Sequence, residues 1–260
     1  MNIIDIYQVD AFADDVFKGN PAAVCKLDKW LDDKVLQDIA KENNLSETAF
    51  FVKEEENYHL RWFTPEYEID LCGHSTLATA YVIFQFIDSS SIEILFKTMS
   101  GEIKVIKDNE LLSMEFPIRE GKRAEVPNEI IEGLGVIPRE VFKARDLMVV
   151  LESEDDIKYL SPNKEILDRL DVDGIIVTAK GDKCDFVSRF FATRSVIFED
   201  PVTGSAHCTL VPYWSRRLNK NIFEAKQLST RGGTLYCELD ENKVKIAGKA
   251  KLYLKGQIYI

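Results

Sequence analysis

Two short glycine-centred segments, residues 72–75 and 203–207, are the places in this sequence where backbone groups could do chemistry. Each follows a strand-like stretch, 61–64 and 189–192, and each opens an apolar stretch of helical character. The N-terminus of a helix presents unpaired backbone N–H groups and a partial positive charge. Two such termini facing each other would form a cleft that binds a carboxylate. The sequence therefore predicts an enzyme acting on a small anionic molecule.

Glu47 and His74 are the candidates for proton transfer. Glu47 is the only charged residue between Glu42 and Lys53. Apolar neighbours should raise its pKa, which suits a general base or acid; the alternative is a solvated or capping glutamate. His74 follows Gly73 directly, so the positive helix end should lower its pKa and leave a neutral imidazole that relays a proton. The alternative for His74 is a packing or capping histidine.

Carboxylates also precede both glycine segments. Asp200 stands directly before residues 201–204, and Asp70 has the matching place within one residue of register. Both can be ordinary turn or capping residues, or one of them faces the substrate. Cys72, at a predicted helix N-terminus, could have a depressed pKa and act as a thiolate. Its repeat partner is Thr203, which argues against a symmetric two-thiol mechanism.

The elements around these segments recur along the chain. Helices are expected at 31–40, 75–87, 163–170 and 205–218, the last with a kink or break at Pro212. Nearly constant offsets separate matching positions: Val52 and Val177, Arg61 and Arg189, Gly73 and Gly204. We expect two similar halves, 1–115 and 116–260, each a curved sheet around one buried helix, with the last strand free to return to the first half.

Composition excludes several function classes. The net charge is -11, with no basic run to offset it, so nucleic acid and anionic membranes are not expected partners. The longest apolar run, 77–87, is too short for a membrane span, and the start has no basic region of a signal peptide. The five cysteines form no C-x-x-C, and no H-x-x-x-H, G-x-G-x-x-G or Walker pattern occurs. We expect a cytoplasmic protein without a metal, nucleotide or flavin.

Five ordered motifs cover essentially the whole chain. Together they resemble the PhzF-like family of phenazine-biosynthesis isomerases, which is related in fold to diaminopimelate epimerase; the motifs are residues 10–24, 45–50, 61–65, 68–78 and 200–207. The resemblance implies an α+β fold of two pseudo-symmetric halves, each a barrel-like, mostly antiparallel sheet wrapped around a central helix. It also implies a site in the cleft between the halves, proton transfer without a cofactor, and a homodimer.

The resemblance also assigns roles to residues. Glu47 matches the base, with His74 and Asp200 at supporting polar positions. The substrate-binding positions, backbone amides among them, are Asn20, Ser46, Asp70, Gly73, Ser75, Gly204 and Ser205. Phenazine-pathway members have a turn closer to Pro-Phe-Ala-Gly-His-Pro, whereas residues 70–75 read Asp-Leu-Cys-Gly-His-Ser. The added carboxylate and thiol could change what binds.

Two other functions fit the same sequence. An amino-acid epimerase or racemase would use Glu47 with a second base. A non-catalytic protein would keep the cleft only to bind a small anion, but a carboxylate such as Glu47 disfavours this interpretation because it repels an anion.

Overall fold

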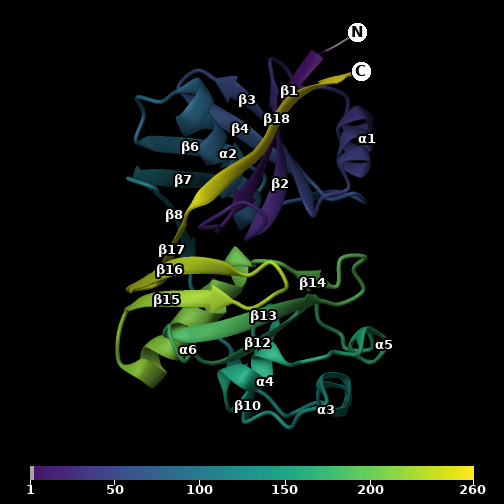
Figure 1. Ribbon diagram of the computed structural model, residues 1–260, viewed down its shortest axis with the longest axis vertical. Helices are drawn as coiled ribbons and strands as arrows, with labels where there is room; N and C mark the ends of the chain where they lie inside the picture. The colour runs from purple at the N-terminus through teal and green to yellow at the C-terminus, as the bar shows by residue number, and fades with distance from the viewer. Residues whose placement is uncertain (1–2) are drawn as a thin grey trace. The chain divides into compact units, whose positions relative to one another are not determined.

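The chain divides into two compact units. The computed structural model describes residues 3–260; residues 1 and 2, with which the first predicted half begins, lie outside the described part. One unit comprises the chain up to Glu115 together with residues 247–260, and the other comprises residues 116–246. The C-terminal strand β18 (Ala250–Tyr259) belongs to the first unit because it pairs antiparallel with β1 (Ile3–Ala11) (Figure 1). Residues 247–249, which the sequence-based prediction gave to the second half, join it there.

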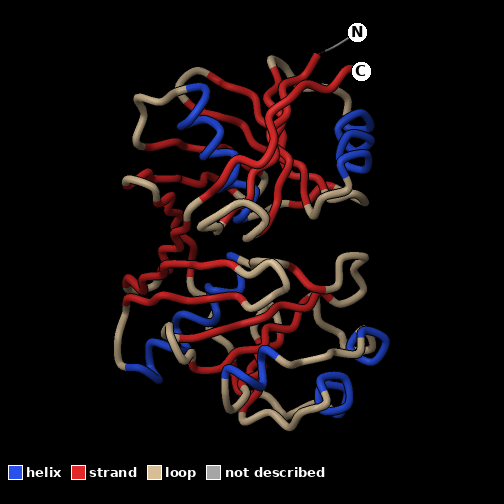
Figure 2. Tube along the Cα trace, in the orientation of Figure 1, coloured by secondary structure: helices blue, strands red, loops and turns tan. Residues whose placement is uncertain are grey.

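The first unit is a curled sheet around a buried helix (Figure 2). Its strands are paired in the order β18, β1, β2 (Asn20–Leu27), β3 (Glu47–Glu54), β4 (Asn57–Phe63), β6 (Glu93–Thr98), β7 (Gly101–Asp108) and β8 (Leu111–Pro117). The short β5 (Glu68–Ile69) pairs with β4. Helix α2 (Gly73–Val82) packs against β1, β2, β3 and β18, and it continues as one π-helical turn, Ile83–Ile87. Its lack of a polar face explains why it is enclosed.

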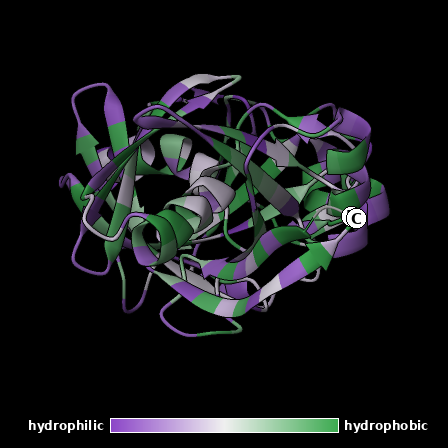
Figure 3. Cartoon of the chain, turned by 90° about the horizontal axis from the view of Figure 1, so that it is seen from above, coloured by the Kyte–Doolittle hydropathy of each residue, from purple (hydrophilic) through white to green (hydrophobic). Residues whose placement is uncertain are grey.

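Helix α1 (Asp33–Asn43) lies where the sequence predicts the first helix, ending three residues later. It covers the first unit with one face only, burying Leu36, Ile39 and Ala40. The strands alternate in the same way between apolar and polar residues, as the changing colour along them in Figure 3 shows. No helix in the described part of the chain is both long and apolar enough to span a membrane.

The second unit is built from shorter pieces. Its strands are β9 (Lys122–Arg123), β10 (Glu140–Lys143), β11 (Leu147–Val150), β12 (Gly174–Lys180), β13 (Phe186–Ala192), β14 (Glu199–Asp200), β15 (Ile222–Gln227), β16 (Gly233–Asp240) and β17 (Lys243–Gly248). Its helices are α3 (Asn128–Leu134), α4 (Glu154–Lys158), α5 (Lys164–Leu167), a 3-10 turn Gly204–Ala206 and α6 (His207–Leu218). The helix predicted at 163–170 is therefore much shorter than expected.

Strand pairing follows the same pattern in both units. In the first, β1–β2 is antiparallel, β2–β3 parallel, β3–β4 antiparallel and β4–β6 parallel. In the second, β10–β11, β11–β12, β12–β13 and β13–β15 repeat that series. A short strand and a helix, β5 with α2 and β14 with α6, precede the second parallel partner in each unit. The two sheets therefore have one topology.

Helix α6 corrects the expectation at Pro212. The helix runs through this proline to Leu218, so a break is wrong, and the alternative of a kink stays a prediction. A proline at this position cannot bond the carbonyl of Cys208. That carbonyl instead accepts a hydrogen bond from the backbone N–H of Arg119 at 2.9 Å. Because the carbonyl is satisfied from outside the helix, the proline costs less than it would in an isolated helix.

Candidate active site

Glu47 and His74 form a buried ion pair in the first unit. Glu47 is the first residue of β3, and His74 is the second residue of α2, which packs against β3. Glu47 Oε2 lies 2.9 Å from His74 Nε2. His74 is 5% exposed, and the Glu47 side chain retains 16% exposure. The carboxylate thus faces both the imidazole and a route to solvent.

The other edge of the imidazole faces the amide of Asn20 and the thiol of Cys72. Asn20, fully buried at the start of β2, places Nδ2 3.2 Å from His74 Nδ1. Cys72, the residue before α2, places Sγ 3.5 Å from the same nitrogen. The ring thus contacts Glu47 at Nε2 as an ion pair, and it contacts Asn20 and Cys72 at Nδ1.

The charge of His74 differs from the sequence-based expectation. Burial acts to lower the pKa of His74, but Cys72 and Glu47 more than offset it, and the pKa is raised well above its usual value. The expected lowering by the helix terminus is therefore wrong, because the contacts with Cys72 and Glu47 outweigh a partial helix charge. The expected depression at Cys72 is also wrong: burial, reinforced by Glu47, raises the pKa of the thiol.

Glu47, Cys72 and His74 offer donor atoms that lie within 4.8 Å of one another, the arrangement of a potential metal site. However, the thiol lies at Nδ1 and the carboxylate at Nε2, on opposite edges of the ring. One ion can bind only one of these nitrogens, because their lone pairs diverge. The geometry thus fits an imidazole in polar contact on both edges better than three ligands around one ion.

The remaining predicted positions of the first unit differ in their surroundings. Gly73 opens α2, and Ser75 is fully buried within it. Ser46 is half-buried directly before β3. Asp70 is exposed, two residues before the N-cap Cys72. Gly73 and Ser75 therefore lie at the helix start beside His74, whereas Asp70 lies exposed to solvent.

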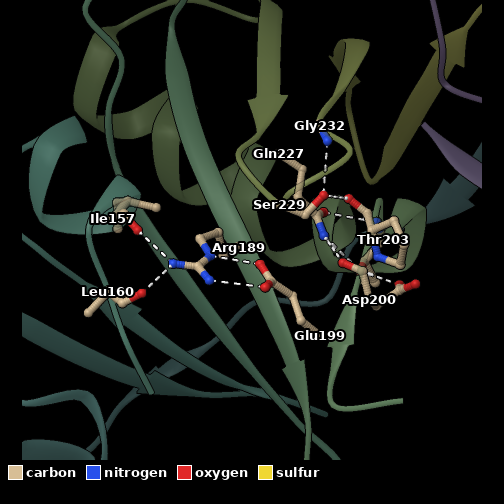
Figure 4. Close-up of polar contacts among 10 residues, drawn as sticks. Ile157, Leu160, Arg189, Glu199, Asp200, Thr203, Gln227, Ser229 and Gly232 are labelled. Carbon is tan, nitrogen blue, oxygen red and sulfur yellow. Dashed lines mark hydrogen bonds and ion pairs between the residues drawn. The ribbon is translucent and has the colours of Figure 1, made fainter. Parts of the chain in front are cut away.

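In the second unit, the turn at 200–203 carries the other predicted residues. Thr203 Oγ1 donates to Asp200 Oδ2 at 2.5 Å (Figure 4). Gly204 begins the 3-10 turn and is buried, while Ser205 is half-buried. The predicted single helix from 205 is thus a 3-10 turn followed by α6, which leaves backbone N–H groups of the turn to be satisfied by other partners.

His207, at the start of α6, is a packing residue. It is fully buried, and its Nδ1 lies 3.0 Å from the carbonyl oxygen of Thr203. A carbonyl only accepts, so Nδ1 carries the proton. Burial lowers the pKa of His207 to about 4, and the ring is neutral at pH 7.

A matching arginine–glutamate pair supports the turn in each unit. Arg61 binds Glu68 through two hydrogen bonds of 2.6 and 2.7 Å. Arg189 binds Glu199 through two bonds of 2.7 and 3.0 Å, and it also donates to the carbonyls of residues 157 and 160 (Figure 4). Bidentate pairs of this kind fix geometry as well as charge. They brace the short strands β5 and β14 that lead into the two glycine turns.

Glu47 has no counterpart at the matching position of the second unit. Phe63 lies two residues after Arg61, and Phe191 lies two residues after Arg189, so the two phenylalanines are equivalent. Phe63 pairs with Thr48, and Phe191 pairs with Ile175. The residue before Thr48 is Glu47, and the residue before Ile175 is Gly174. A Cβ at Gly174 would lie 2.2 Å from the ring of Phe190, so a side chain does not fit there. The pair formed by Glu47 and His74 thus has no carboxylate counterpart in β12.

Comparison with known proteins agrees with these features. A family model described as "Phenazine biosynthesis-like protein" matches residues 9–256. The chain belongs to the PhzC-PhzF family. This PhzF-family protein is 48% identical over 257 residues to an uncharacterized isomerase of Pseudomonas aeruginosa, with 99% of each protein covered. The family resemblance seen in the sequence is therefore confirmed. The prediction of an isomerase is confirmed at the level of the family, because the relatives carry that name.

The fold prediction is confirmed by solved structures. The PhzF-family protein matches a crystal structure of a PhzF-family protein from Enterococcus faecalis with a TM-score of 0.98 and 50% identity, over 100% of both chains. A hydroxyproline epimerase from Agrobacterium vitis, with a TM-score of 0.65 and 9% identity over 98% of this chain and 92% of that chain, shares the fold alone.

Gln227 is a residue of the candidate site that the sequence analysis did not predict. This residue ends β15, a strand absent from the predicted elements, and its amide contacts both Asp200 and Thr203. The signal was present as a short alternation of apolar and polar residues at 223–226. The contact itself joins residues far apart in the sequence, so no local pattern indicates it.

Proposed function

We propose that this protein is a cofactor-independent isomerase that moves a proton on a small carboxylate-bearing metabolite, with Glu47 as the base. The observation that carries the proposal is the pair formed by Glu47 and His74, which joins a partly accessible carboxylate to a buried imidazole. A well-placed base contributes about 10²–10⁴-fold to the rate.

In the proposed reaction, Glu47 removes a proton from a carbon of the substrate and returns it at a second position. The imidazole of His74 lies against the Glu47 carboxylate and orients it for the transfer. Asn20 and Cys72 hold the other edge of the ring, so the imidazole cannot rotate freely. Each named group acts in place, without a bound cofactor.

The negative charge that develops on the substrate needs stabilisation. The backbone amides at the start of α2, including Gly73, and those of Gly204 and Ser205 are proposed to supply it, a contribution of about 3 kcal/mol per donor in oxyanion holes. Asp200 is proposed to orient a polar group of the substrate. That both halves share one substrate, as the family resemblance implies, is part of this proposal.

An amino-acid epimerase is the second candidate. The observation that favours it is the carboxylate of Asp200, a possible second base in the other unit, on a fold shared with a hydroxyproline epimerase. Gly174 and Thr203 offer no such base: the first has no side chain, and the second directs its hydroxyl to Asp200. One-base isomerisation therefore fits the two turns better.

The test uses deuterium incorporation and works before the substrate has been identified. A small-molecule extract of the source organism is incubated in D₂O with the protein, and carboxylic acids that gain mass are identified by mass spectrometry. The variant is Glu47→Gln, which keeps the shape and removes the base. The matched control is Glu54→Gln, at the opposite, partly exposed end of the same strand.

We expect incorporation with the wild type and with Glu54→Gln, and a rate about 10²–10⁴-fold lower with Glu47→Gln. NMR of the product locates the deuterium: exchange confined to Cα of an amino acid supports the epimerase, and a label at another carbon supports the isomerase. Undiminished exchange in Glu47→Gln, together with its loss in Cys72→Ser, would identify the thiol as the base. No exchange with any compound would support a binding protein.

We extend the proposal to the setting of the enzyme. The five cysteines are widely spaced in the sequence, and all five are free thiols. Free thiols are typical of a reducing compartment, so we propose a cytoplasmic protein. A homodimer is proposed from the family resemblance and from exposed Tyr253 and Leu254 on β18, which are 49% and 43% exposed.

A further inference from the structure

The amide of Gln227 holds both ends of the turn that carries Asp200 (Figure 4). Gln227 is 1% exposed. Its Nε2 lies 2.7 Å from the carbonyl oxygen of Asp200 and 3.3 Å from Thr203 Oγ1. Its Oε1 lies 2.9 Å from the backbone nitrogen of Thr203. One buried side chain thus makes three hydrogen bonds to a four-residue turn.

The backbone determines the direction of these hydrogen bonds. The N–H of Thr203 can only donate, so the atom facing it is the amide oxygen, and the amide nitrogen faces the hydroxyl. Because Gln227 donates to Thr203 Oγ1, the threonine proton is directed to Asp200 Oδ2. The Asp200 carboxylate therefore accepts from the Thr203 hydroxyl. The order of donation is Gln227, then Thr203, then Asp200.

Ser229 holds the next peptide group of the turn, the carbonyl of Pro201, in a similar way. The backbone N–H of Gly232 donates to Ser229 Oγ at 3.0 Å, and Ser229 donates to the carbonyl oxygen of Pro201 at 2.8 Å (Figure 4). Two consecutive carbonyl groups of the turn, those of Asp200 and Pro201, are therefore satisfied by side chains from residues 227–229. The turn is held from one side by the segment that follows β15.

The first unit has no equivalent of Gln227 at this register. Phe186 in β13 pairs with Ala225, and Tyr58 in β4 pairs with Phe96. Two residues further on, the second unit has Gln227 and the first has Thr98, whose hydroxyl donates to Gly101 within its own hairpin. The amide therefore accompanies Asp200 and Thr203 and does not belong to the repeated framework.

We propose that Gln227 is a positioning residue for the reaction, which through Thr203 holds the Asp200 carboxylate as an oriented hydrogen-bond acceptor. The inference rests on the proposed function, in which Asp200 contacts the substrate. It also gives Thr203 a definite role: its proton is committed to Asp200, so it does not act as a second base in place of the thiol at the matching position, Cys72.

Three variants separate this role from plain packing. Gln227→Glu keeps the shape and the acceptor for the N–H of Thr203, but it removes both donated hydrogen bonds. Thr203→Val removes only the hydroxyl, and Thr203→Ser keeps it. The control is Gln257→Glu, since Gln257 is exposed on β18 and donates only to Asp5 among its described contacts. Thermal unfolding of every variant establishes that it is folded.

The first measurement is a crystal structure of each variant without ligand. We expect the Asp200 carboxylate to change direction in Gln227→Glu and in Thr203→Val, and to stay in place in Thr203→Ser and Gln257→Glu. An unchanged carboxylate in both Gln227→Glu and Thr203→Val would overturn the proposal. Because Thr203→Val does not alter Gln227, it decides the question even where Gln227→Glu does not fold.

The second measurement is the rate of deuterium incorporation into the compound identified with the wild type. We expect kcat to fall about 10- to 100-fold in Gln227→Glu and Thr203→Val, with a smaller change in KM, because misorientation by about 1 Å costs this much. Thr203→Ser should recover most of the rate; equal loss in Thr203→Ser and Thr203→Val would overturn the role of the hydroxyl. If the wild type incorporates no deuterium, the proposed function fails while the crystal structures still decide the positioning.

Discussion

At the scale of single residues, His74 shows how contact overrides local charge. Its position at the start of α2 exposes it to the positive helix terminus, yet Glu47 lies 2.9 Å away. A whole charge in ion-pair contact acts more strongly than about half a charge spread over the first helical turn. The imidazole therefore favours its protonated form, with Asn20 and Cys72 at its other nitrogen, Nδ1.

The titration of His74 tests this arrangement. In Glu47→Gln, the carboxylate that raises the pKa is gone while burial remains, so the pKa of His74 should fall. The chain has only three histidines, and NMR titration of the ring protons, assigned with His74→Gln, follows each one. His59, which is partly exposed in β4, serves as an internal reference. An unchanged pKa in Glu47→Gln would show that the carboxylate is not responsible.

The same shift predicts the sign of a stability difference. The pKa of His74 is higher in the folded state than in the unfolded chain, so its stabilisation is complete below about pH 6.5 and is lost as the pH rises toward the folded value. The difference in free energy of unfolding between wild type and His74→Gln should therefore shrink above that pH. Urea denaturation at several pH values measures it, and a difference that grows with pH would contradict the ion pair.

At the scale of elements, the start of α6 behaves in the opposite way. His207 is enclosed beside Thr203 and Phe186, and burial alone dominates its titration. Two helix starts at equivalent places in the repeat thus hold one histidine that favours the charged form and one that favours the neutral form. The difference comes from the immediate neighbours: His74 lies beside Cys72 and Glu47, whereas Nδ1 of His207 faces the carbonyl of Thr203.

His207 predicts a loss of stability in acid. Its pKa is about 4 in the folded state and about 6.5 in the unfolded chain, so the unfolded state binds more protons between these values. Stability should rise with pH across this interval and be complete above it, an effect of about 3 kcal/mol. Urea denaturation of wild type and His207→Gln at pH 4.5 and 7.5 measures it. An equal pH dependence in the two proteins would rule out His207 as the cause.

At the scale of the whole molecule, duplication and specialisation are both visible. The two units share a series of parallel and antiparallel pairings and a pair of arginine–glutamate braces. They differ where chemistry is proposed: a carboxylate, imidazole and thiol in one, and a carboxylate, hydroxyl and amide in the other. The framework repeats while the polar side chains do not, as expected when one duplicated scaffold serves a single asymmetric substrate.

The assembly is a separate prediction. A chain of 29.7 kDa that forms the proposed homodimer should sediment at twice this mass at micromolar concentration. Tyr253→Lys and Leu254→Lys, on the exposed face of β18, should weaken the dimer because they place charge in an apolar contact. A control substitution at Ile137, also exposed but in the second unit, should leave it intact. Sedimentation as a single 29.7 kDa species would remove the proposal.

Much of the site could be predicted from the sequence. The two glycine turns, Glu47 and the order of the elements are written in short stretches of chain, because turn chemistry and hydrophobic periodicity act over a few residues. The repeat could be recognised because matching residues, such as Val52 and Val177 or Gly73 and Gly204, recur at nearly constant offsets. The family resemblance rested on the same local motifs and is confirmed by the comparisons.

The tertiary structure alone decided the charges and the supporting contacts. The sequence places His74 beside a helix terminus, but only packing brings Glu47 to its Nε2 and reverses the direction of its pKa shift. Pro212 predicts a kink or break, but the helix continues, and the backbone N–H of Arg119 bonds the carbonyl of Cys208 that the proline leaves free. Gln227 acquires its role only where β15 ends beside the Asp200 turn. Electrostatic and hydrogen-bond energies depend on distances of a few ångströms, which packing sets between residues far apart in the chain.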